Sequence, residues 1–115
     1  MTEPASRTER RRAPRALADF PIRFSETPDS DPAVLRDISE IGLASTSPQQ
    51  IPEMTLVALD FCLPGSVEPH HVTGAVVRCE PHPKGRYDLA VYFTEIASST
   101  RAALAGFVKR AQPAP

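Results

Sequence analysis

The sequence predicts a mainly β fold, namely a six-stranded antiparallel β-barrel with one C-terminal α-helix. Thirteen prolines among 115 residues divide the chain into short pieces and exclude helices from most of it. Several of these pieces alternate apolar and polar residues, as strands with one buried face do. The longest proline-free stretch, 84–112, instead carries apolar residues at helical spacing.

The expected strands follow one another with short turns. In the first, Phe20, Ile22 and Phe24 share one face and are expected in the core, while Pro21 places the strand at an edge or a bulge. The fourth alternates most regularly, with an inward set of Val57, Leu59, Phe61 and Leu63. Proline–glycine turns close two of the later strands. The strands are expected at 17–25, 33–38, 41–46, 54–63, 71–80 and 86–94.

The last element is predicted to be an amphipathic helix. Its apolar face comprises Leu104, Phe107, Val108 and Ala111. Ser98 or Ser99 is expected to cap its start, and Lys109 and Arg110 suit the negative end of the helix dipole. A barrel covered by this helix leaves no sheet edge exposed, which solves a difficulty of small isolated sheets.

Length and charge indicate one domain with a distinct N-terminal segment. We expect a flexible basic arm at 1–10, a single domain at 11–110 and a flexible tail at 111–115. Residues 1–15 carry a net charge of +3 and the remainder −4, which together give the −1 of the chain. The body would therefore repel a polyanion, so this distribution argues against nucleic-acid coating and favours a small anion held at one place.

The cellular setting is expected to be cytoplasmic. No apolar run approaches the length of a membrane span, and no apolar segment follows the charged N-terminus as in a secretory signal. Two cysteines do not form a disulfide framework at this length. We therefore expect a protein with free thiols and no membrane insertion.

Pairing of the first two strands brings two polar groups to one rim of the barrel. Arg11 and Arg15 precede the first strand, while Asp37, Ser39 and Gly42 follow the second. A hairpin centred near residue 29 would place Arg15 opposite roughly residue 43. Guanidinium groups suit phosphates and the O6/N7 edge of guanine, and a carboxylate suits the guanine N1–H and N2–H donors. Glycine allows a turn or a close backbone approach. This set of residues suits a guanine nucleotide.

Other site chemistries find less support. Cys79 and His82 have the spacing of one metal-ligand pair, but no second pair occurs at a suitable distance, so no metal is expected. No Gly-x-Ser-x-Gly elbow and no paired carboxylates for acid–base chemistry are recognisable, so an enzyme is not expected. Arg86 and Tyr87 are interpreted as strand surface.

The same residues resemble the PilZ domain family. Arg11-Arg12-Ala13-Pro14-Arg15 resembles its RxxxR motif, and Asp37-Ile38-Ser39-Glu40-Ile41-Gly42 its [D/N]xSxxG motif. The segment 87–93 and the terminal helix are also similar, so the resemblance covers about residues 10–110. Many members carry glycine at the position of Ile41, which bears on the detailed geometry of the turn.

The resemblance implies a non-enzymatic bacterial receptor for cyclic di-GMP that needs no cofactor. Arg11 and Arg15 would hold phosphates and guanine edges, Asp37 and Ser39 would bind guanine, Gly42 would shape the turn, and Arg10 and Arg12 would assist. Ligand would order the arginine segment and change a surface read by a protein partner, within the family's range of motility and biofilm control. The alternative is a PilZ-like protein–protein adaptor that does not bind the nucleotide. No specific nucleic acid is expected, and a ligand-dependent homodimer is left open.

Overall fold

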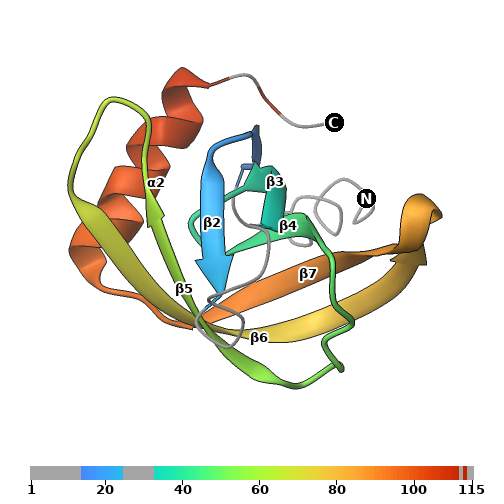
Figure 1. The fold of residues 1–115 in the computed structure, drawn as a ribbon. Helices are drawn as coiled ribbons and strands as arrows, with labels where there is room; N and C mark the ends of the chain where they lie inside the picture. Colours follow the sequence, from blue (N-terminus) through green and yellow to red (C-terminus); the bar gives the residue numbers. More distant parts are fainter. Residues whose placement is uncertain (1–13, 25–32, 112, 114–115) are drawn as a thin grey trace, which may run out of the picture.

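The computed structural model describes residues 14–24, 33–111 and 113. These residues form short strands, one 3-10 turn and one long helix in the order shown in Figure 1. The elements are β1 (Ala16–Leu17), β2 (Pro21–Phe24), β3 (Ala33–Ile38), β4 (Gly42–Ser47), β5 (Leu56–Cys62), β6 (Pro69–His82), η1 (Pro83–Gly85), β7 (Arg86–Glu95) and α2 (Ser98–Arg110).

The strands close into the predicted six-stranded antiparallel barrel. The pairing order is β3-β2-β5-β6-β7-β4, and β4 pairs back with β3 to complete the ring. The short strand β1 also pairs with β3 and is an addition to the six. Closure gives every strand of the ring a partner on each side, although residues 78–82 of β6 extend past β5 and pair with β7 alone among the described strands.

The first expected strand, 17–25, is interrupted. Its two parts, β1 and β2, both pair with β3, and residues 18–20 lie between them. Phe20 turns its ring into the core, where it packs against the rings of Phe61 and Phe107 at centroid distances of 6.0 and 5.6 Å. Pro21 follows directly and has no N–H for the ladder, which agrees with the expectation that it marks an irregularity.

The predicted register of this hairpin is wrong by four residues at β1 and by three at β2. Ala16 pairs with Ile38, so Arg15 lies beside the turn that starts at Ser39 and not opposite residue 43. Residues directly opposite in an antiparallel pair share a face of the sheet. The predicted register would have set buried Ile22 opposite exposed Arg36, whereas the observed pair is Ile22 with Ala33.

The core contains the side chains that alternation assigned to it. Ile22, Phe24, Val57, Leu59 and Phe61 are all at least 95% buried. Their neighbours along β5 point outward, as expected. Residue alternation therefore identified the inner face of the barrel correctly.

The helix α2 lies against the barrel beside β5 and β6 (Figure 1). Leu104 is completely buried, and Phe107 meets Phe20 edge to face. The capping prediction is wrong, because Ala97 occupies the N-cap, while Ser98 and Ser99 lie inside the first turn and make no capping bond. Ile96, the residue before this cap, packs against the core. No helix among the described residues is long and apolar enough to cross a membrane.

Candidate functional site

A serine side chain holds the turn between β3 and β4. The backbone N–H of Ser39 donates to the carbonyl of Gly42 at 2.8 Å. The Ser39 Oγ accepts from the N–H groups of Ile41 at 3.1 Å and Gly42 at 3.3 Å. Ser39 is 2% exposed, so these bonds are shielded from water. Its hydroxyl is therefore committed to the turn and fixes the path of the chain from Asp37 to Gly42.

Gly42 is required by a close backbone approach. It pairs with Tyr92 of β7, and a Cβ at this position would lie 2.4 Å from the carbonyl oxygen of Val91. The φ of Gly42 lies outside the left-handed region, so the turn itself does not demand glycine. Of the two roles considered for this residue, the structure supports the close approach.

A β-bulge directs Asp37 toward the outer surface. The register of β3 against β4 shifts between Leu35 and Asp37. As a result Leu35 and Ile38 are both buried, while Arg36 and Asp37 between them both face outward. The Nη1 of Arg36 lies 3.3 Å from Oδ1 of Asp88 on β7. This contact crosses the outer face of β4, which lies between β3 and β7.

Arg15 and Asp37 form the centre of the site. The Arg15 Nη2 lies 3.0 Å from the Asp37 Oδ1, and the two side chains are 40% and 20% exposed. The Asp37 Oδ1 is shielded from solvent, and the Arg15 guanidinium lies within reach of it at an angle outside that of a regular hydrogen bond. A carboxylate has two oxygens with about four acceptor positions, so one guanidinium does not use its full capacity.

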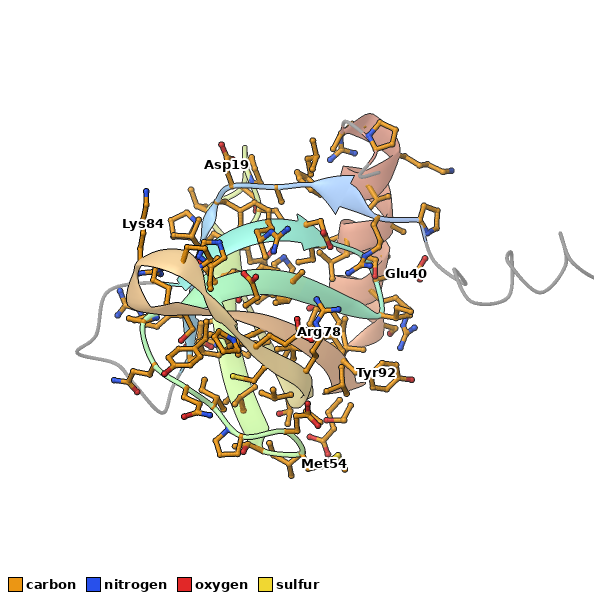
Figure 2. All side chains as sticks on the ribbon, turned by 90° about the vertical axis from the view of Figure 1, so that its right-hand side faces the viewer. Asp19, Glu40, Met54, Arg78, Lys84 and Tyr92 are labelled. Carbon is orange, nitrogen blue, oxygen red and sulfur yellow. The ribbon has the colours of Figure 1, made fainter. Side chains whose placement is uncertain are left out.

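Two alanines separate Asp37 from Arg78 across the sheet. One row of paired residues runs across the sheet from Asp37 through Ala44 and Ala90 to Arg78. Ala44 is buried and Ala90 half-buried, whereas Arg78 is exposed. Figure 2 shows Arg78 on the same side of the barrel as Glu40 and Tyr92.

The structure thus brings together four of the residues predicted from sequence: Arg15, Asp37, Ser39 and Gly42. The other three, Arg10, Arg11 and Arg12, lie outside the described residues. Arg86 lies away from the turn, where its Nη2 donates to Thr46 Oγ1 at 3.3 Å. Arg78 was missed, because only the register of β6, β7 and β4 reveals that it shares a row with Asp37.

The histidines and cysteines of the described segments do not form a metal centre. No group of three His, Cys, Asp or Glu side chains in these segments could hold an ion. His71 pairs with Asp60, and His70 Nδ1 lies 2.9 Å from Thr100 Oγ1, which links β6 to α2. Cys62 and Cys79 are free thiols.

Comparison with known proteins agrees with this architecture. The PilZ domain family matches residues 9–110. No curated protein matches the sequence. Among solved structures, the inhibitor of motility MotI/DgrA of Bacillus subtilis is similar with a TM-score of 0.75 and 18% identity, over 87% of this chain and 50% of that chain. This chain therefore corresponds to about half of that protein, and at this identity the likeness concerns the fold.

Proposed function

The chain belongs to the PilZ domain family, and from this premise we propose that it is a non-enzymatic receptor for cyclic di-GMP. The observation that carries the proposal is the carboxylate of Asp37. Its Oδ1 lies 3.0 Å from Nη2 of Arg15, and its side chain stays 20% exposed beside the β3–β4 turn. The N1–H and N2–H of guanine are two parallel donors of the kind that a carboxylate accepts.

Charge supports an anionic ligand at the same place. Arg15 stays 40% exposed although it contacts Asp37, so its side chain can be reached from solvent. Arg11 and Arg12 precede it by a few residues, and Arg10 lies just before them. We propose that Arg11 and Arg15 hold the phosphates and guanine edges, because guanidinium groups form bidentate, charge-assisted hydrogen bonds with both.

The turn supplies rigidity rather than further ligand donors. The Ser39 hydroxyl already bonds within the turn, and Gly42 keeps β4 close to β7. Binding to a preformed turn avoids part of the entropy cost of ordering a site. We propose that Ser39 and Gly42 act by holding Asp37 in place.

In this proposal the output is a change of surface. Ligand held between Arg11, Arg15 and Asp37 would fix the segment before Pro14 against the barrel rim and present it to a protein partner. Trypsin cleaves after arginine, and this segment carries Arg7, Arg10, Arg11 and Arg12. Slower cleavage at these positions with cyclic di-GMP is the expected result, and an unchanged cleavage rate would contradict the ordering step.

Calorimetric titration with cyclic di-GMP at moderate salt tests the receptor assignment. We expect saturable binding that weakens as salt rises, because the phosphate contacts are electrostatic. Arg15→Ala should weaken binding by about 2 kcal/mol, or about 30-fold. Arg23→Ala is the matched control. Arg23 is an exposed arginine of β2 that lies opposite Asp60 of β5 in the sheet, away from the site. No binding by the unaltered chain would refute the receptor and leave the protein–protein adaptor.

A further inference from the structure

Exposed apolar side chains gather on the outer face of the sheet, away from the end of β6 that lies beside α2. Met54, Leu56, Val77 and Tyr92 are 77%, 62%, 51% and 52% exposed, and we call these four the outer-sheet patch. Single exposed apolar residues are common on protein surfaces, whereas contiguous groups mark sites of association.

Strand pairing shows that the outer-sheet patch is continuous. Leu56 of β5 lies opposite Ala75 of β6, which lies opposite Tyr92 of β7. The N–H of Met54 donates to the carbonyl of Val76 at 2.6 Å. Met54 therefore lies beside Val76, the residue of β6 that follows Ala75. Val77 is the extra residue of the bulge between Val76 and Arg78. Three adjacent strands therefore contribute to one apolar surface.

Met54 is held in a conformation that its side chain does not favour. Its φ is 73°, and it is one of two non-glycine residues with a positive φ among the described segments. The N–H of Thr55 donates to the carbonyl of Pro52, so Met54 occupies the third position of a turn, where glycine is preferred. Because this side chain adds nothing to the core, the fold alone does not account for methionine here.

Charged residues flank the outer-sheet patch in a self-complementary order. Along the strands, Arg78 lies on one side of the row formed by Leu56, Ala75 and Tyr92, and Glu95 lies on the other. Both charged side chains are exposed. A two-fold axis along this row would set Arg78 of one copy opposite Thr73 of the other, and the strand neighbour of Thr73 is Glu95, so two Arg78–Glu95 pairs would lie close together. An isologous interface requires this kind of pattern.

We propose that the outer-sheet patch is the docking surface for a second copy of this chain, with or without nucleotide. Its composition fits an interface core, in which aromatic residues and methionine are enriched and charges lie at the rim. The net charge of −1 opposes self-association only weakly. Gly42 of the β3–β4 turn pairs with Tyr92, so the interface would adjoin the candidate site.

Sedimentation velocity of the full chain without nucleotide, from low micromolar to near-millimolar concentration, tests this proposal. We expect a reversible monomer–dimer equilibrium. Leu56→Asp should weaken the dimer about tenfold or more, because it places a carboxylate in the apolar centre. Val67→Asp is the matched control, since Val67 is 96% exposed in the β5–β6 connection and should leave the equilibrium unchanged.

A charge exchange tests the two-fold arrangement. Arg78→Glu and Glu95→Arg should each weaken the dimer, and the double variant should restore it, because opposite charges would again face each other. A monomer at every concentration would overturn the proposal, as would equal effects of Leu56→Asp and Val67→Asp. Failure of the double variant to recover would overturn the pairing of Arg78 with Glu95. None of these results depends on cyclic di-GMP, so they are separate from those that test the receptor.

Discussion

The α-carbon of Gly42 lies so close to Val91 that a Cβ would stand 2.4 Å from the Val91 carbonyl oxygen. This backbone oxygen belongs to a central barrel strand and cannot move aside as a flexible side chain does. Gly42→Ala should therefore lower the free energy of unfolding by about 1–3 kcal/mol, the usual cost of overpacking. Urea unfolding followed by circular dichroism measures this change.

Gly106→Ala is the control for the general effect of replacing a glycine. Gly106 lies in α2, and a Cβ there would lie 3.3 Å from Nη1 of Arg110, the mobile end of an exposed side chain. Alanine favours a helix by up to about 1 kcal/mol over glycine. We expect this variant to be as stable as the original or more stable. Equal losses at both positions would contradict the assigned role of Gly42.

Ser39→Ala should destabilise the protein although it removes only one atom. The hydroxyl accepts two backbone hydrogen bonds inside a turn that is shielded from solvent. Its removal leaves two N–H groups without a partner, which should cost about 1–2 kcal/mol of the free energy of unfolding. Ser66→Ala provides a comparison, because the Ser66 Oγ accepts one bond in an exposed turn and should change stability little. Thermal unfolding distinguishes the two.

Asp37→Asn should weaken cyclic di-GMP binding with little effect on stability. The substitution keeps the shape of the side chain but replaces a carboxylate with one acceptor and one donor group, which cannot receive both guanine N–H groups. We expect a loss of about tenfold or more in affinity. Because the Arg15–Asp37 pair is partly exposed, the change in unfolding free energy should stay within about 1 kcal/mol.

Asp60→Asn is the counterpart of this variant elsewhere on the barrel. Asp60 pairs with His71 across β5 and β6 and takes no part in the candidate site. The Asp60→Asn substitution should leave the affinity for cyclic di-GMP, measured by calorimetry, unchanged. If both asparagine variants bound the nucleotide as the original chain does, Asp37 would not be the guanine acceptor.

Local patterns predicted the inner face of the barrel but not the alignment of its strands. Alternation places Ile22 and Leu59 in the core because every second residue of a strand faces inward. The predicted register against β3 was wrong mainly because the hairpin was assumed to be centred on residue 29, whereas the pairs of β2 with β3 are already displaced by three residues. The irregularity between β2 and β1 adds one more residue. The spacing of Leu35 and Ile38 indicates the bulge, since two buried strand residues three positions apart cannot alternate strictly.

The candidate site was predictable where its residues belong to motifs. The turn from Asp37 to Gly42 is continuous in sequence, and its proximity to Arg15 required only that two neighbouring strands pair. Arg78 lies on the same row as Asp37 only through three strand pairings, which no local pattern reveals. The outer-sheet patch depends on long-range register in the same way.

Met54→Gly should stabilise the protein. Glycine adopts a positive φ without steric cost, so the replacement relieves strain at this turn and should raise the free energy of unfolding by about 0.5–1 kcal/mol. Met54→Ala is the control, because it removes the side chain beyond Cβ but retains the strain. Thermal unfolding at low protein concentration should show a gain of a few degrees for glycine and none for alanine. Equal behaviour of both would show that the backbone conformation costs little.

Leu104→Ala should cause a large loss of stability. Leu104 is completely buried where α2 meets the barrel core, and its neighbour one turn later, Phe107, contacts Phe20. Truncation of a buried leucine leaves a cavity and costs about 2–5 kcal/mol. Val67→Ala should have almost no effect, because Val67 is 96% exposed. Urea unfolding measures both variants. A small change for Leu104→Ala would mean that α2 is not an integral part of the barrel core, and the assignment of its apolar face would have to be abandoned.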